Sequence, residues 1–279
     1  MAKPITPDLI YDLVSVSNPS VSPDGSKVVF VKSQYDEKMK EFQSQVMVTG
    51  ISSDNIRPFT QGTKDSSPRF SPDGKSVAFI RPDESSRKQI HLISTEGGEA
   101  RQLTSVDGNI GEFSWSPDGS RIAFASDVDH DSPSENEQDS EHTVKVVNRI
   151  RYRFDTLGWR GNKHSHLFTV DTETCNVYQI TDGDWDDHLP AWSPDGNKIA
   201  FISDRTKDRD ITNRREAYVV SSSGGKPKRW SGGLISVLVA IWSPEGEKLL
   251  VLGTEDPEVI LPWQSQVFVL EDKSVPLRV

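Results

Sequence analysis

The chain has little of several features that define common protein classes. Its 279 residues include one cysteine, Cys175, which excludes an internal disulfide framework and multi-cysteine zinc sites. No segment approaches the roughly 20 apolar residues that span a bilayer, and the N-terminus lacks the apolar run of a secretory signal. The 32 basic residues are outnumbered by 42 acidic ones, which opposes a role in neutralising nucleic-acid phosphates. We expect a cytoplasmic protein with no nucleic-acid or membrane partner.

Sequence motifs of common hydrolases and metalloenzymes are also absent. No Gly-x-Ser-x-Gly pentapeptide occurs, so the strained elbow that carries the nucleophile of α/β-hydrolases is missing. The histidines show no His-Glu-x-x-His spacing; they are His91, His130, His142, His164, His166 and His188. We therefore predict no catalytic residue and no cofactor in this chain.

What the sequence does contain is one turn repeated five times. Each copy reads Ser-Pro-Asp-Gly, with glutamate for aspartate in the last, and precedes a short apolar run typical of a strand. Proline presets φ at the second turn position and glycine accepts a left-handed conformation, so each copy closes a hairpin. The repetition argues that these serines and aspartates form turns and are not catalytic. The copies are Ser22–Gly25, Ser71–Gly74, Ser116–Gly119, Ser193–Gly196 and Ser243–Gly246.

The spacing of the turns predicts the fold. From serine to serine the intervals are 49, 45, 77 and 50 residues, which suits the four-stranded blades of a β-propeller. Thr6-Pro7-Asp8 favours the start of a short helix, whose Leu9, Ile10 and Leu13 we expect to pack on the first blade. We predict an all-β chain of about five TolB- or WD40-like blades. The expected parts are a lead-in with the helix over 1–16 and blades over 17–62, 66–106, 111–183, 188–232 and 238–279.

The long third interval indicates an insertion with two parts. Residues 127–142 carry seven carboxylates and no lysine or arginine, a composition typical of a solvated loop. Residues 144–163 are rich in arginine. Within them, 144–154 alternate basic and apolar side chains, which predicts a strand.

Four residues of this insertion are candidates for substrate contact. Arg149, Arg151 and Arg153 would share one face of the predicted strand. A row of guanidinium groups can hold a carboxylate or a peptide carbonyl; alternatively, these arginines pair with the neighbouring acidic loop. Trp159, next to Gly158 and Arg160, is a candidate for recognition.

A second acidic segment, 182–188, raises the question of a metal. Asp182, Asp184 and Asp186 offer the oxygen ligands that calcium prefers, and the same holds for the Asp127-x-Asp129-x-Asp131 run. Neither spacing fits a calcium-binding loop, and aspartate and glycine are common in turns for conformational reasons. We predict no bound metal.

Together these features resemble the N-terminal propeller of the prolyl oligopeptidase family of serine peptidases, nearest its acylaminoacyl-peptidase and dipeptidyl-aminopeptidase branch. The resemblance is carried by Ile5-Thr6-Pro7, the Trp-Ser-Pro-Asp-Gly-x-x-Ile-Ala-Phe repeats, and the insertion Arg149–Gly161 followed by His166-Leu167-Phe168. TolB-type propellers share the repeat, whereas the arginine-rich insertion favours the peptidase branch.

The resemblance implies a propeller of about seven blades joined to an α/β-hydrolase domain with a Ser-Asp-His triad. The propeller of such a protein covers the active site and admits short peptides. In some relatives a propeller arginine contacts the substrate backbone, a role that would fall to Arg151 or Arg153. With about five blades and no elbow, this chain departs from that plan, and we expect an incomplete ring and a fragment without catalytic residues of its own.

Three functions are compatible with this sequence. The first is the substrate-gating portion of a serine peptidase of acylaminoacyl or dipeptidyl type, with catalysis supplied by a hydrolase domain or subunit. The second is a stand-alone TolB-like propeller that binds a protein partner without catalysis. The third, a hydrolase with its site in the central channel, lacks a recognisable set of inner carboxylates. Blade faces left open to water favour association, so we expect self-association or a protein partner.

Overall fold

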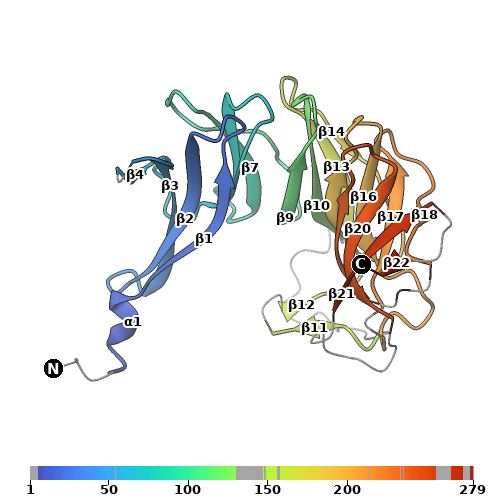
Figure 1. The fold of residues 1–279 in the computed structure, drawn as a ribbon. Coiled ribbons are helices and arrows are strands. Elements are labelled where there is room, and N and C mark those ends of the chain that lie inside the picture. The colour runs from blue at the N-terminus through green and yellow to red at the C-terminus, as the bar shows by residue number, and fades with distance from the viewer. Residues whose placement is uncertain are drawn as a thin grey trace. The chain divides into compact units, whose positions relative to one another are not determined.

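Five four-stranded antiparallel sheets and one short helix make up most of the structure (Figure 1). This is a computed structural model that describes residues 6–53, 55–129, 147, 149–155, 158–212, 214–232, 234, 236–255, 265–272 and 277–278. The predicted all-β fold of about five four-stranded blades is confirmed. No helix in these ranges is long and apolar enough to cross a membrane.

The chain divides into two compact units. Unit 1 comprises residues 1–110, 118–120 and 172–175, and unit 2 comprises 111–117, 121–171 and 176–279. Unit 1 holds the first two sheets. The first is β1 (Val14–Val21), β2 (Lys27–Asp36), β3 (Glu41–Gly50) and β4 (Arg57–Pro58), and the second is β5 (Ser66–Phe70), β6 (Ser76–Pro82), β7 (Lys88–Ser94) and β8 (Arg101–Gln102).

The helix α1 (Leu9–Asp12) precedes the first sheet. Its N-cap residue is Asp8, which makes no side-chain capping bond. The helix lies against the first blade, as expected: the Tyr11 carbonyl accepts from Gln34 Nε2 on β2 at 3.0 Å, and the centre of the Tyr11 ring lies 5.6 Å from that of Tyr35. The expectation that Leu9, Ile10 and Leu13 make this contact is wrong, because these side chains are 41–58% exposed. A single turn has too few residues to turn all three towards the sheet.

Unit 2 holds the other sheets, and each four-stranded sheet is here called a blade. The third is β9 (Ile110–Trp115), β10 (Arg121–Asp129), β13 (Lys163–Asp171) and β14 (Val177–Gln179). The fourth is β15 (Asp187–Trp192), β16 (Lys198–Ser203), β17 (Glu216–Ser221) and β18 (Lys228–Arg229). The fifth is β19 (Ser236–Trp242), β20 (Lys248–Thr254), β21 (Gln266–Glu271) and β22 (Leu277–Arg278).

The insertion of the third blade differs from the predicted strand. Its described part forms a two-stranded hairpin, β11 (Arg153–Phe154) and β12 (Gly158–Trp159), between β10 and β13. The expected strand over 144–154 is wrong, because Arg149 to Tyr152 lie outside any strand. Their arginines instead reach acceptors on the loop between β16 and β17, as described below. Of the predicted acidic loop, residues 127–129 belong to β10 and 130–142 lie outside the described residues.

The repeated turns have the conformation that the sequence predicts. In the fourth blade, the Gly196 N–H donates to the Ser193 carbonyl at 2.9 Å, with Gly196 at φ +70°. The Ser193 hydroxyl donates to Asp195 at 2.5 Å and accepts from the Lys198 N–H at 2.9 Å. The hydrogen bond from Ser193, followed by that from the Asn197 N–H, lowers the pKa of Asp195 to about 2. Serine and aspartate therefore hold the turn closed, as proposed.

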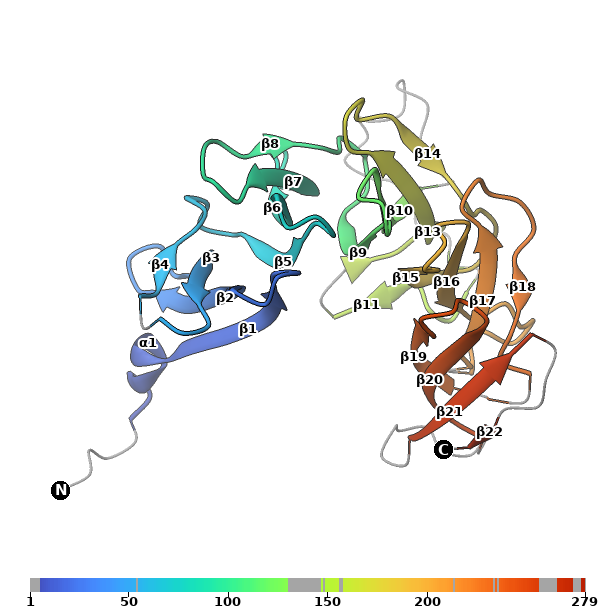
Figure 2. The same ribbon diagram turned by 45° about the horizontal axis from the view of Figure 1, so that its top comes forward.

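Within each of the two units, successive blades pack face to face, and each blade has two unlike sides. We call the side that carries the residue just before the repeated turn the large face, and the opposite side the small face. The large face of the fourth blade packs on Ala123, Ala125 and Leu167 of the third. Its small face packs on the large face of the fifth (Figure 2). That contact joins Leu189, Ala191, Ala200, Ile202, Ala217 and Val219 to Trp242, Leu249, Val251, Phe268 and Leu270.

Candidate functional site

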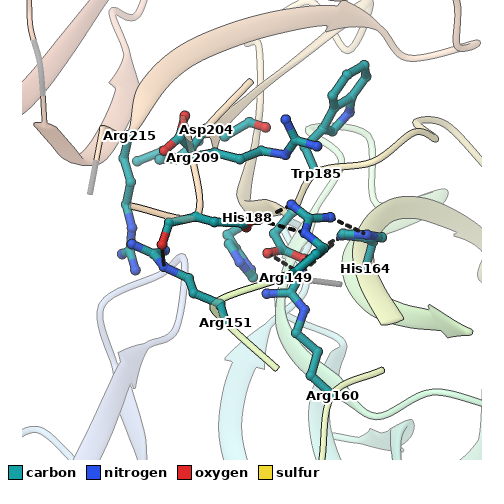
Figure 3. Close-up of a pocket in the computed structure, with 13 residues that line it drawn as sticks. Arg149, Arg151, Arg160, His164, Trp185, His188, Asp204, Arg209 and Arg215 are labelled. Carbon is teal, nitrogen blue, oxygen red and sulfur yellow. Dashed lines mark hydrogen bonds and ion pairs between the residues drawn. The ribbon is translucent and has the colours of Figure 1, made fainter. Parts of the chain in front are cut away.

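Unit 2 contains a cavity of about 70 Å³ whose lining is rich in arginine (Figure 3). The lining comes from the segment before β11, the residue after β12, the segment leading into β15, the loop between β16 and β17, and residues on the strands β13, β15 and β16. Five arginines contribute, together with His164, Trp185, Asp186, His188, Asp204 and Asp210. The arginines are Arg149, Arg151, Arg160, Arg209 and Arg215.

Arg149 is held by two carboxylates. Its Nε and Nη2 donate to the two oxygens of Asp210 at 2.9 and 2.8 Å, and its Nη1 contacts Asp184. The hydrogen bonds to Asp210 raise the pKa of Arg149 above its usual value. Reciprocally, Arg149 lowers the pKa of Asp210. A paired, two-pronged contact of this kind fixes the guanidinium in one orientation.

Arg151 binds main-chain oxygens of the same loop. Its Nε donates to the Asp210 carbonyl at 3.1 Å and its Nη2 to the Thr212 carbonyl at 2.7 Å. Together with the contact of Arg149, these bonds tie the insertion of the third blade to the β16–β17 loop of the fourth.

Arg160 and His164 surround Asp186. Nη2 of Arg160 lies 2.6 Å from Asp186 Oδ2, and the Ser165 N–H donates to Oδ1 at 3.0 Å. Burial alone would raise the pKa of Asp186, but hydrogen bonds from His164, Arg160 and the Ser165 N–H outweigh it and hold that pKa well below its usual range. The His164 side chain is 5% exposed, and its Nε2 lies 3.0 Å from Asp184 Oδ1. Asp186 is therefore ionised and holds the Arg160 side chain at the cavity.

The calcium candidates are arranged differently from a metal site. Asp184 is bound by Arg149, Arg209 and His164, and a cation would have to displace these groups. Asp182 is exposed and lies apart, beside a second cavity that Tyr218 also lines. Nowhere in the described residues do three or more His, Cys, Asp or Glu side chains gather as metal ligands.

Only two of the four substrate-contact candidates predicted from the sequence lie at the cavity. Arg149 and Arg151 line the cavity, whereas Arg153 and Trp159 do not. Arg153 is exposed on β11, and the Trp159 ring packs against Tyr152 with ring centres 5.6 Å apart.

Sequence reasoning missed Arg209 and Arg215. Arg215 is exposed, and within the described residues its guanidinium has no hydrogen-bond or ion-pair partner. Figure 3 shows its side chain running towards that of Arg151. Residues 204–215 are densely charged, with four arginines, one lysine and three aspartates. This charge density could have indicated that the segment contributes to a binding site.

The sequence resembles known propeller proteins and peptidases. The sequence pattern of the TolB β-propeller domain matches residues 11–133. An uncharacterized peptidase of Bacillus subtilis, YuxL, is 33% identical over 225 residues, which cover 79% of this chain and 34% of YuxL. Dipeptidyl-peptidase 5 of Porphyromonas gingivalis is 23% identical over 267 residues, covering 90% of this chain and 39% of the relative. The chain therefore carries TolB-type propeller repeats over residues 11–133 and resembles part of these peptidases.

The fold has a counterpart in a solved structure. Acylaminoacyl peptidase of Pyrococcus horikoshii superposes with a TM-score of 0.71 at 17% identity, covering 95% of this chain and 40% of that one. At this identity the likeness concerns the fold. The chain spans about a third of the length of the curated relatives named above.

Proposed function

We propose that this chain is the substrate-gating, non-catalytic portion of a serine peptidase that cleaves short peptides. The similarity to YuxL and dipeptidyl-peptidase 5 supports the peptidase class. The observation that carries the proposal is the pair Arg151 and Arg215 on the arginine-lined cavity. Guanidinium groups are suited to the carbonyl and carboxylate oxygens of a peptide.

The two arginines would contribute in different ways. Arg151 is held in place by the carbonyls of Asp210 and Thr212, so little freedom is lost when a ligand binds beside it. Arg215 has no side-chain partner in the described residues, so its donors remain available. Two neighbouring cations repel, and a peptide oxygen placed between them would relieve that repulsion.

In this proposal the cleavage chemistry belongs to a hydrolase domain or subunit. This sequence carries no Gly-x-Ser-x-Gly elbow, and the cavity is lined by groups that bind and orient. Acylaminoacyl or dipeptidyl peptides are the proposed substrates, by analogy with the named relatives.

Peptide binding to the purified chain tests the proposal. Acetylated di- and tripeptides are titrated by isothermal calorimetry against the wild type, Arg215→Met and Arg214→Met. A hydrogen bond to a charged group contributes about 1.5–3 kcal/mol, so Arg215→Met is expected to weaken binding by about tenfold or more. Arg214 adjoins Arg215 but does not line the cavity, so Arg214→Met is the matched control. Equal affinities for both variants, or no peptide binding by the wild type, would contradict the proposal.

Activity measurements give a second readout. The chain alone is expected to leave acylaminoacyl and dipeptidyl anilides intact. Hydrolysis that copurifies with the chain through successive columns and is lost on substitution of one of its own serines would show that it is itself catalytic.

A stand-alone TolB-like scaffold is the second candidate, favoured by the TolB pattern over 11–133. It predicts that peptides fail to bind at the arginine cavity and that a folded protein partner binds instead. Calorimetry with short peptides therefore separates the two candidates.

A further inference from the structure

Positive charge is in excess around the arginine-lined cavity. Three of its arginines contact a carboxylate, in the pairs Arg149–Asp210, Arg160–Asp186 and Arg209–Asp184. Arg215 is exposed and, within the described residues, its guanidinium makes no hydrogen bond or ion pair. Even when Asp184, which lies outside the lining, is counted, five guanidinium groups face four carboxylates. This balance favours an anionic ligand and disfavours the ammonium group of a peptide N-terminus.

His188 offers a second donor on the same lining. It is half-buried on β15, and among the described residues its ring has no hydrogen-bond or ion-pair partner. Even a neutral imidazole carries one N–H. β15 has a β-bulge directly after His188, with Leu189 at φ +54°, and such a bulge re-aims a neighbouring side chain. Ser17 and Ser66 precede the same bulge in the first and second blades, so the backbone geometry is shared while the imidazole is particular to the fourth.

The lining also contains a carboxylate, Asp204, that could have competed for these donors. Its Oδ1 accepts from the Thr206 N–H at 3.1 Å and from the Thr206 hydroxyl at 2.7 Å. Its Oδ2 is buried. Asp204 therefore engages neither Arg215 nor His188, and both donors remain available to a ligand.

The volume of the cavity limits the size of the group that can enter. At about 70 Å³ it is about half as large as a cavity of about 150 Å³ that holds benzene. A group of about three or four non-hydrogen atoms therefore fits, and a carboxylate has this size. A chain end can enter such a space, whereas a residue within a peptide continues on both sides.

From this we propose that the cavity binds the C-terminal carboxylate of a short peptide, with Arg215 and His188 each donating a hydrogen bond to it. The inference rests on the proposed peptide-binding function and narrows it to peptides with a free C-terminus. A peptide held by its last residue presents only the few bonds upstream of that residue for cleavage. Recognition of this end would thus select for short substrates.

Calorimetry with matched tripeptides tests the proposal on the whole chain. The ligands are acetyl-Ala-Ala-Ala as the free acid, the same peptide as its C-terminal amide, and acetyl-Ala-Glu-Ala amide, which carries a carboxylate only on a side chain. The acid is expected to bind at least about tenfold more tightly than either amide, because charge-assisted hydrogen bonds are stronger than neutral ones. Arg215→Met and His188→Phe should each bring the ratio of acid to amide affinity towards one, and Arg214→Met should leave it unchanged.

Each other outcome has a distinct meaning. Acid and amide bound equally, and both weakened by Arg215→Met, would overturn the carboxylate inference and leave the proposed function intact. Glutamate-containing amide bound as tightly as the acid would overturn recognition of the chain end, and a wild-type ratio in His188→Phe would overturn the role of His188. Failure of the wild type to bind any of the three peptides would contradict the proposed function itself. Because each variant is judged by a ratio of two affinities, a loss of folded protein would not imitate the expected result.

Discussion

Trp242 Nε1 donates a hydrogen bond to the main-chain oxygen of Ala191, 2.9 Å away. One blade earlier, Trp192 Nε1 donates to the main-chain oxygen of Ser114 at 3.1 Å. In both cases the acceptor directly precedes the large-face residue of the preceding blade, Trp192 or Trp115. Each indole therefore links its own blade to a fixed position on the blade before it.

Replacing Trp242 by phenylalanine should isolate this hydrogen bond. Phenylalanine fits the position, since Phe70 occupies it in the second blade and is 9% exposed. The change removes the indole donor, and the loss of one such hydrogen bond costs about 0.5–1.5 kcal/mol. Urea unfolding measures the loss. Tyr178→Phe, at a side chain 58% exposed on β14, is the surface control and should change the free energy of unfolding by less than about 0.5 kcal/mol.

The repeats could be predicted because their structure is encoded locally. A turn such as Ser193–Gly196 needs only a preset φ at proline, a left-handed glycine and a serine within reach of an aspartate. Five copies, separated by about 50 residues except where the third blade carries its insertion, then determine the number of blades. No contact distant in the sequence is needed for either step.

The cavity is different because distant contacts determine it. The alternation over 144–154 predicted a strand, yet Arg149 and Arg151 bind Asp210 and the Thr212 carbonyl about 60 residues away. An alternating pattern does not reveal that a side chain has a stronger acceptor elsewhere. For the same reason, Arg215 stood out in the sequence only as one charge among many.

The glycines that close the repeated turns should differ in how much stability they lose when replaced by alanine. Gly196 has φ +70° and Gly246 φ +75°, a conformation that costs a residue with a Cβ about 1–2 kcal/mol. An added Cβ would lie 3.8 Å from Pro117 at Gly196, an ordinary contact, but 3.3 Å from Pro194 at Gly246. We expect Gly196→Ala to lose about the backbone cost alone and Gly246→Ala to lose more. Equal losses in urea unfolding would show that the Pro194 ring moves freely.

A buried ion pair in the second blade should be costly to break. Asp65 is fully buried, and Arg81 donates to both its oxygens at 2.7 and 2.8 Å while lying over the Phe79 ring at 5.0 Å. Arg81→Met would leave an unpaired buried carboxylate, a change that costs about 3–5 kcal/mol.

Neutralising the remaining partner should restore much of that loss. The double variant Arg81→Met, Asp65→Asn has no buried charge, so its free energy of unfolding should lie above that of Arg81→Met alone. If the double variant is no more stable than the single one, the lost packing of Arg81 on Phe79 accounts for the effect, and the charge does not.

Acid should weaken the turn of the fourth blade through Asp195. Hydrogen bonds from Ser193 and Asn197 lower the folded-state pKa of Asp195 to about 2, against about 3.9 in an unfolded chain. The stabilisation from this carboxylate is therefore fully present above about pH 4 and is lost as the pH falls through about 2. Ser193→Ala removes the larger contribution, so the difference in stability between wild type and variant should shrink from pH 6 to pH 2.

The fifth turn supplies the control for this pH dependence. Ser243 accepts from the Lys248 N–H at 3.2 Å, as Ser193 does from Lys198, but within the described residues it makes no bond to Glu245. Ser243→Ala should thus lower stability by an amount that stays constant between pH 6 and pH 2. Carbon-detected NMR titration of Asp195 measures the cause directly, since its pKa should rise in Ser193→Ala and stay near 2 in Ser243→Ala. An unchanged Asp195 pKa in Ser193→Ala would show that the main-chain N–H of Asn197 suffices to hold the carboxylate ionised.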